Sequence, residues 1–217
     1  MATNPRNQLQ TVSPPRLPAA PVEYSQRYGD DLTNILRLYF NQLSNGLAGL
    51  LAPQGGKYIN TVYAAVQRTT DKTFTVNTAT QITFNQTDYI NGAVNDGTDG
   101  IVVNQAGIYN YQFSVQWRNT DSQEHDAWIW LRVNNVDVPG TASQFSVIAR
   151  HGSVDGAVIG AANFFVELQA NDTVEMWSAV SNTNVRMDAA AAQTSPFPMP
   201  AIPSVVATLS FVSSILT

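Results

Sequence analysis

The stretch "GIYNYQFSVQW", residues 107–117, decides the fold class of this chain. Its large apolar residues occupy every second position. They are Tyr109, Tyr111, Phe113, Val115 and Trp117, and they alternate with Ile108, Asn110, Gln112, Ser114 and Gln116. Successive side chains of a strand point to opposite faces, so this period of two predicts a long strand with one face buried and one face polar.

Shorter runs of the same kind lie on both sides of this stretch. We expect strands at 60–68, 80–85, 100–105, 127–134, 143–150, 157–168, 172–180 and 204–216. Turn pairs separate them, namely Asn91-Gly92, Asp96-Gly97, Asn134-Asn135 and Asp155-Gly156. Residues 189–203 are predicted to form a loop before the last strand. Many short strands without alternating helices predict an all-β sandwich or jelly roll.

The composition of residues 1–22 predicts an extended arm. The segment has few hydrophobic residues and five prolines, Pro5, Pro14, Pro15, Pro18 and Pro21. Proline fixes φ and extends the residue before it, so the arm is polyproline-like and cannot bury itself. We expect a partner to bind it, through Pro14, Pro15, Leu17, Pro18, Pro21 and Tyr24.

Residues 23–51 predict a helix, and residues up to 56 a Gly-rich connector to a β domain at 57–217. The apolar residues that step by three or four are Leu32, Leu36, Tyr39, Leu43, Leu47 and Leu50. Asp30 and Asp31 are expected near the helix start, and the segment 53–56 is expected to end it. A helix this apolar either docks on the β domain or packs against copies of itself, and the sequence leaves both open.

Composition excludes several classes of protein. Charged residues make up 12% of the 217 residues, about half of the usual value of about 25%. The net charge is -5 and no basic stripe exists, so we expect no nucleic-acid partner. No cysteine, no run of 18 apolar residues and no signal peptide is visible, so no disulfide, membrane span or secretion is expected. The scarcity of lysine, only Lys57 and Lys72, hints at surfaces committed to assembly.

No residue pattern predicts an enzyme, a cofactor or a metal site. His125 and His151 are the only histidines; His125 is interpreted as a loop residue, and His151 with Ser153 and Asp155 lacks the geometry of a triad. The segment "NDGTDG" (95–100) offers oxygen ligands for Ca²⁺, but a turn is the favoured interpretation. Glu167 and Glu175 are expected to flank a solvated turn rather than to form an acid/base pair.

The four tryptophans allow two interpretations. Trp117, Trp128, Trp130 and Trp177 can form a sugar- or receptor-binding shelf, or they can pack in the core or at a trimer interface. Trp128 and Trp130 are expected to share one strand face. Packing is favoured, because large aromatic side chains dominate both cores and interfaces.

The β part resembles the C1q/tumour-necrosis-factor type of jelly roll. The resemblance lies in "ITFNQTDYINGAVNDGTDGIVVNQAGIYNYQFSVQW" (82–117), with a Phe-Asn pair, a turn-rich loop, a short strand and then Gly-x-Tyr opening a long strand. Weaker likenesses are "LRVNNVDV" (131–138), "VELQANDTVEMW" (166–177) and "ATLSFVSSIL" (207–216), where Val and Ser replace the family's Gly-Phe. The resemblance covers about residues 58–217. It implies a compact homotrimer with aromatic residues around the threefold axis.

The N-terminal part, "LPAAPVEYSQRYGDDLTNILRLYFNQL" (17–43), resembles the opening of small virion proteins of tailed bacteriophages. The resemblance implies a trimeric capsid decoration (cement) protein at the capsid surface, made in the host cytoplasm and anchored to the major capsid protein or another virion protein. Two alternatives stay open. One is a fibre or tail-attached adhesin that recognises host glycans, and the other is a C1q-like ligand-binding module.

Overall fold

The computed structural model describes residues 14–51, 61–95, 97–98 and 100–215. The side chains of 48–51 are not described. The chain separates into two compact units, Met1–Asn60 and Thr61–Thr217. Each unit is described by itself.

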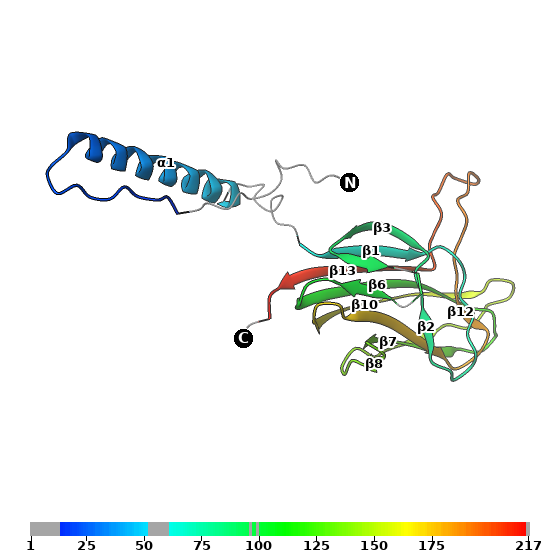
Figure 1. Cartoon of the computed structure of the whole chain (residues 1–217). Coiled ribbons are helices and arrows are strands. Elements are labelled where there is room, and N and C mark those ends of the chain that lie inside the picture. The colour runs from blue at the N-terminus through cyan, green and yellow to red at the C-terminus, as the bar shows by residue number, and fades with distance from the viewer. Residues whose placement is uncertain (1–13, 52–60, 96, 99, 216–217) are drawn as a thin grey trace. The chain divides into compact units, whose positions relative to one another are not determined.

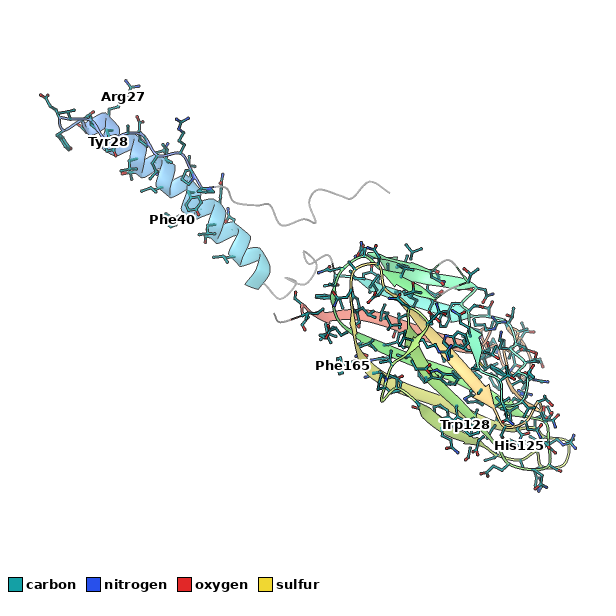
Figure 2. The ribbon with its side chains drawn as sticks, turned by 60° about the horizontal axis from the view of Figure 1, so that its bottom comes forward. Arg27, Tyr28, Phe40, His125, Trp128 and Phe165 are labelled. Carbon is teal, nitrogen blue, oxygen red and sulfur yellow. The ribbon has the colours of Figure 1, made fainter. Side chains whose placement is uncertain are left out.

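The first unit contains one helix, α1 (Gln26–Leu51), and residues 14–24 run back beside it (Figures 1 and 2). The helix begins three residues later than predicted because Ser25 caps it. The Ser25 hydroxyl accepts a hydrogen bond from the Tyr28 N–H at 3.4 Å, and the Ser25 carbonyl accepts one from Gly29 at 3.2 Å. Asp30 and Asp31 lie near the helix start, as predicted, although they follow the first turn rather than form part of it. The predicted stop at 53–56 lies outside the described residues.

The second unit contains two antiparallel sheets. We call the first one sheet A, and its strand order is β10-β6-β13-β1-β3, with β12 also paired to β6. Its strands are β1 (Tyr63–Arg68), β3 (Gln86–Asn91), β6 (Gly107–Asn119), β10 (Gly156–Leu168), β12 (Val185–Met187) and β13 (Val205–Ser213). The predicted long strand is β6, which pairs with β10 over its whole length and, on its other edge, with β13 along residues 108–115 and with β12 along residues 117–119.

Sheet B has the strand order β4-β5-β11-β7-β8, with β2 also paired to β11 and β9 to β7. Its strands are β2 (Thr80–Ile82), β4 (Ala93–Asn95), β5 (Ile101–Val103), β7 (His125–Val133), β8 (Val136–Asp137), β9 (Ser143–Val147) and β11 (Thr173–Val180). Consecutive long strands β6, β7, β10, β11 and β13 alternate between the sheets, as Figure 1 shows. This is the jelly-roll arrangement, so the predicted all-β sandwich preceded by one helix is confirmed.

The core fills the space between the inner faces of the sheets. Every predicted inward residue of 107–117 is buried, and the inward residues of the other long strands are buried or partly buried. The largest of them are Trp117, Tyr109, Tyr111, Phe84, Ile129, Leu131, Leu168, Met176 and Leu209. The predicted period of two is confirmed by these positions.

Several local expectations differ from the structure. Residues 86–91, where no strand was predicted, form β3, and residues 93–95 of the expected turn-rich loop form β4, with Gly92 between the two strands. The turn expected at Asp155-Gly156 lies earlier, closed by the reciprocal His151–Val154 backbone bonds. The loop before the last strand is a hairpin-like finger, residues 188–204, held by the bridges Ala190–Ile202 and Gln193–Met199 (the orange projection in Figure 1).

Candidate functional site

The sandwich presents two outer faces with different chemistry. Face A is the set of side chains that point outward from sheet A, and face B is the corresponding set of sheet B. Strand register places the members of each face, because residues paired across antiparallel strands point to the same side.

Face A is flat, small and almost uncharged. Its two central rows run across β10, β6, β13 and β1 in register. They are Ala161, Ser114, Val206 and Gln67, and Asn163, Gln112, Thr208 and Ala65. The charged residue at one end, Arg118, is paired with Asp188 at 2.7 Å and Asp155 at 3.6 Å. The centre of face A therefore offers small polar side chains without charge, while Glu167 on β10 is exposed at its margin.

Several polar side chains at the centre of face A have no partner in the part of the chain that the structure describes, although Gln67 at its edge donates a hydrogen bond to Asp88. No side-chain hydrogen bond reaches Gln112, Ser114 or Thr208, and Asn110 Oδ1 is buried without a partner. Such groups are satisfied by water or by a second molecule.

A hollow of about 200 Å³ opens in the middle of face A. It is lined by Gln112, Phe113, Ser114, Val206 and Thr208. Next to it, β10 projects two large apolar side chains, Ile159 at 66% and Phe165 at 65% exposure; Figure 2 labels Phe165. The face thus carries both a hollow and apolar side chains suited to fill one.

Face B carries three of the four tryptophans. Trp128 and Trp130 share the outer side of β7, as predicted, and Trp177 on β11 lies directly opposite Trp130. Only Trp117 lies in the core; the other three are half-buried on face B (Figure 2 labels Trp128). Packing in the core is therefore confirmed for Trp117; the other three lie outside the core, and their packing at a trimer interface stays a prediction.

Carboxylates and a guanidinium hold two of these indoles in place. The Trp130 Nε1–H donates to Asp137 Oδ1 at 2.7 Å, and Arg132 Nε donates to the same oxygen at 2.6 Å. The Arg132 guanidinium lies 4.0 Å from the centre of the Trp177 ring, a cation–π contact. These hydrogen bonds from Arg132 and Trp130 lower the pKa of the Asp137 carboxyl.

Glu175 is a buried carboxylate of the same network. Only 3% of it is exposed, and its two oxygens accept hydrogen bonds from Trp177 Nε1 at 2.7 Å and from the Asn135 backbone at 2.9 Å. A buried carboxylate is costly unless it is paired in this way. The bonds fix both the Trp177 ring and the hairpin turn that contains Asn135.

A polar hollow of about 290 Å³ lies at this end of face B. It is lined by Gln81, Asn134, Asn135, Thr173 and Glu175. Asn134 and Asn135 adopt φ of 50° and 66°, the left-handed region that the predicted two-residue turn requires. Asn134 is tied to the next turn by bonds of its side-chain amide to Asp172 and to the Thr173 N–H.

In the N-terminal unit, none of the described side chains of residues 14–47 is buried. Of the predicted arm residues, Pro15 and Pro18 are half-buried, and the exposed ones are Pro14, Leu17, Pro21 and Tyr24. Of the predicted helix face, Leu32, Leu36, Tyr39 and Leu43 are half-buried and Leu47 is exposed. The side chain of Leu50 lies outside the described residues. Tyr28 and Ile35 join the half-buried face, and Leu38 and Phe40 are exposed (Figure 2 labels Tyr28 and Phe40).

His125 begins strand β7, so its interpretation as a loop residue is wrong, and its Nε2 lies 2.8 Å from Asp121 Oδ2. Hydrogen bonds from His125 and the Ser122 N–H lower the pKa of Asp121. Asp155, which the sequence placed near His151, pairs with Arg118 instead.

The two carboxylates weighed as a pair lie on different sheets. Glu167 is exposed on β10, and Glu175 is buried on β11. Asp96 and Asp99 of the segment weighed for Ca²⁺ lie outside the described residues. The described residues contain no group of three potential metal ligands, and none of their helices is long and apolar enough to cross a membrane.

Comparison with known proteins finds similarity among solved structures only. No protein-family profile matches the chain, and no curated protein matches its sequence. A solved structure of the globular domain of zebrafish complement 1qA is similar at a TM-score of 0.41 and 11% identity, covering 71% of this chain and 99% of that one. The jelly-roll assignment rests on this chain's own strand order.

Proposed function

We propose that this protein is a homotrimeric structural protein of a virus particle, a capsid decoration protein of a tailed phage. In this proposal the jelly roll forms the trimer, and the arm and helix hold it to the major capsid protein. The observation that carries the proposal is that residues 14–47 bury none of their side chains, although α1 has a continuous apolar face. Segments of this kind become ordered against a partner.

Face A supports assembly with further copies of the same chain. Interface cores are depleted of charged residues, as face A is. Its hollow and its projecting Ile159 and Phe165 lie on the same face, so a projecting side chain of one copy fills the hollow of another. Contacts between two different patches generate closed rings when the rotation closes. The resemblance to the C1q/tumour-necrosis-factor type of jelly roll implies that this ring has three copies.

The helix supports the same assembly. Leu32, Leu36, Tyr39 and Leu43 step by four, three and four, the spacing of a coiled-coil seam. In a trimer, two other helices cover this seam. Exposed apolar residues outside the seam, such as Phe40 at 59% and Leu38 at 53%, remain for a second partner.

Three arms on one trimer give avidity. When one arm binds the particle, the other two bind as intramolecular events, so weak individual contacts combine into slow dissociation. Prolines restrict the free arm and so reduce the ordering entropy that binding costs.

The test removes residues 1–22 and measures binding to capsids that lack this protein. By light scattering we expect three times 23.6 kDa for the full-length protein and three times its own smaller chain mass for the truncated protein, which should lose particle binding. Binding at full occupancy by the truncated protein contradicts the anchoring role, and a monomeric mass of the full-length protein contradicts the trimer.

A fibre or tail-attached adhesin for host glycans is the second candidate. The tryptophans on the outside of sheet B favour it, because such side chains recognise ligands when they are not buried in a core. A free C1q-like ligand-binding module is the third candidate, but it leaves the arm and helix without a role. Immunogold labelling of particles separates capsid from tail.

A further inference from the structure

We propose that face B is a glycan-binding site for a neutral, pyranose-based oligosaccharide. The sugar chain lies along β7 from Trp128 to the hollow beside Asn135. This inference does not rest on the proposed function, since the site is complete within one chain.

The aromatic part of the site is a row of flat groups. Trp128, Trp130 and Arg132 follow one another on the outer side of β7, and Trp177 faces Trp130 from β11. Pyranose rings carry axial C–H groups on one face, which pack against flat π systems through weak C–H contacts and buried apolar area. No hydrogen bond within the described residues engages the Trp128 indole, so its N–H is available to a hydroxyl group.

The polar part of the site is fixed before any ligand arrives. Asp137 holds Trp130 and Arg132, while Glu175 holds Trp177 and the Asn135 backbone. A carboxylate has about four acceptor positions, so Glu175 and Asp137 keep positions free for sugar hydroxyls. The side-chain amide of Asn135 has no partner among the described residues and adds donors and an acceptor.

The hollow favours a sugar over a peptide or a nucleic acid. Its lining of amides, a hydroxyl and a carboxylate contains no apolar side chain, whereas protein anchors fill apolar pockets. Its volume of about 290 Å³ lies at the lower end of small-ligand pockets, which suits a single ring. The nearby cation, Arg132, is already neutralised by Asp137, so no free positive charge attracts phosphates.

The length of the row favours an oligosaccharide over a monosaccharide. Six residues separate Trp128 from Asn134, a span of about 20 Å at 3.3 Å per residue. Several rings therefore contact face B at once, with one end ring in the hollow.

The test titrates the full-length protein with three hexasaccharides, of β1,4-linked N-acetylglucosamine, α1,4-linked glucose and β1,4-linked glucose. Tryptophan emission and calorimetry are recorded. We expect saturable binding of at least one with a Kd of about 1 mM or below, and weaker binding of its monosaccharide. The three sugars separate an amino-sugar polymer from an α- or a β-glucan as the natural source.

Variants locate the site. Trp128→Ala removes a ring that holds no part of the network, and we expect at least about tenfold weaker binding, partly restored in Trp128→Phe. Glu175→Gln keeps the size of the side chain but replaces one acceptor oxygen with an amide donor, so one of its two hydrogen bonds is lost and weaker sugar binding is expected. The control Phe197→Ala removes an aromatic side chain exposed at 57% on the finger, and it should bind as the parent does.

Two outcomes overturn the proposal. One is the absence of saturable binding with all three sugars up to about 10 mM, ten times the weakest expected Kd. The other is equal binding by Trp128→Ala and the parent protein. A monomeric protein that binds the sugar at face B leaves this inference intact while removing the proposed trimer.

Discussion

The two outer faces of the sandwich are built on the same pleated scaffold but treat their polar groups in opposite ways. On face A, the amides and hydroxyls of Gln112, Ser114 and Thr208 bind nothing within the described chain. On face B, Trp130 and Trp177 are tied to carboxylates. Unpaired small groups suit a surface that a second copy completes, and a fixed network suits a surface that receives a small ligand.

The largest expected effect comes from placing a charge in the middle of face A. Ser114→Arg puts a guanidinium beside the hollow, and an unpaired buried charge costs on the order of 3–5 kcal/mol for each copy. We expect light scattering to give the mass of one chain. The matched control, Gln144→Arg on the exposed side of β9 in face B, should keep the parent mass. A trimeric Ser114→Arg protein would show that face A is free in the assembly.

The next effect tests whether the helix adds to the contact made by face A. Leu36→Asp combined with Leu43→Asp charges the seam of α1, which costs several kcal/mol only if copies of the helix pack together. We expect weaker association, seen as a higher dissociation concentration in sedimentation. Neither side chain belongs to the jelly roll, so its free energy of unfolding should change by less than about 0.5 kcal/mol. If the double variant sediments as the parent does, the helix makes no contact between copies, and face A alone holds them together.

A smaller effect of opposite sign is expected in the core behind face A. Tyr111 is fully buried, and its hydroxyl has no hydrogen-bond partner among the described residues. The same burial raises the pKa of Tyr111. Tyr111→Phe removes the unpaired hydroxyl, so we expect the free energy of unfolding to rise by about 1 kcal/mol in denaturant titrations. Self-association and sugar binding, which depend on the outer faces, should be unchanged in Tyr111→Phe. A lower free energy of unfolding would instead show that the Tyr111 hydroxyl has a hydrogen-bond partner.

The smallest expected effect is a pH dependence confined to face B. The pKa of Asp137 is lowered in the folded chain by hydrogen bonds from Arg132 and Trp130. A lowered carboxyl pKa stabilises the fold at pH values above the unfolded value near 3.8, and that stabilisation is lost as pH falls through the folded value. The melting temperature of the parent should therefore fall below about pH 4 more steeply than that of Asp137→Asn. Parallel curves would mean that the pair is fully screened by solvent.

The sequence predicted correctly those strands in which buried apolar residues alternate with outward-facing residues. In β6, each second residue is a large apolar side chain that enters the core, so the strand and its inward face were both predictable. In β3, Gln86–Asn91, five of the six residues are exposed and the sixth is half-buried. The sequence of such an edge strand shows no alternation of apolar and polar residues, and its Asp and Asn residues are typical of turns.

The face B network was only partly within reach. The shared side of Trp128 and Trp130 follows from their spacing of two. That Trp177 lies opposite Trp130 depends on the register of β11 against β7, which no local pattern encodes. The bond from Trp177 to Glu175 does follow from their positions two apart on one strand, and a paired Trp and Glu at that spacing is a usable signal.

The position of β13 has a consequence for the order of events during synthesis. This last strand lies between β6 and β1, and it contributes Val206 and Thr208 to the centre of face A. Pairing of Tyr63 with Ser210 spans most of the β unit, so sheet A closes only after nearly all of that unit has left the ribosome. A chain that lacks β13 also lacks Val206 and Thr208 at the centre of face A. Under the proposed assembly through face A, a chain without β13 could not join other copies, so synthesis of β13 would have to precede assembly.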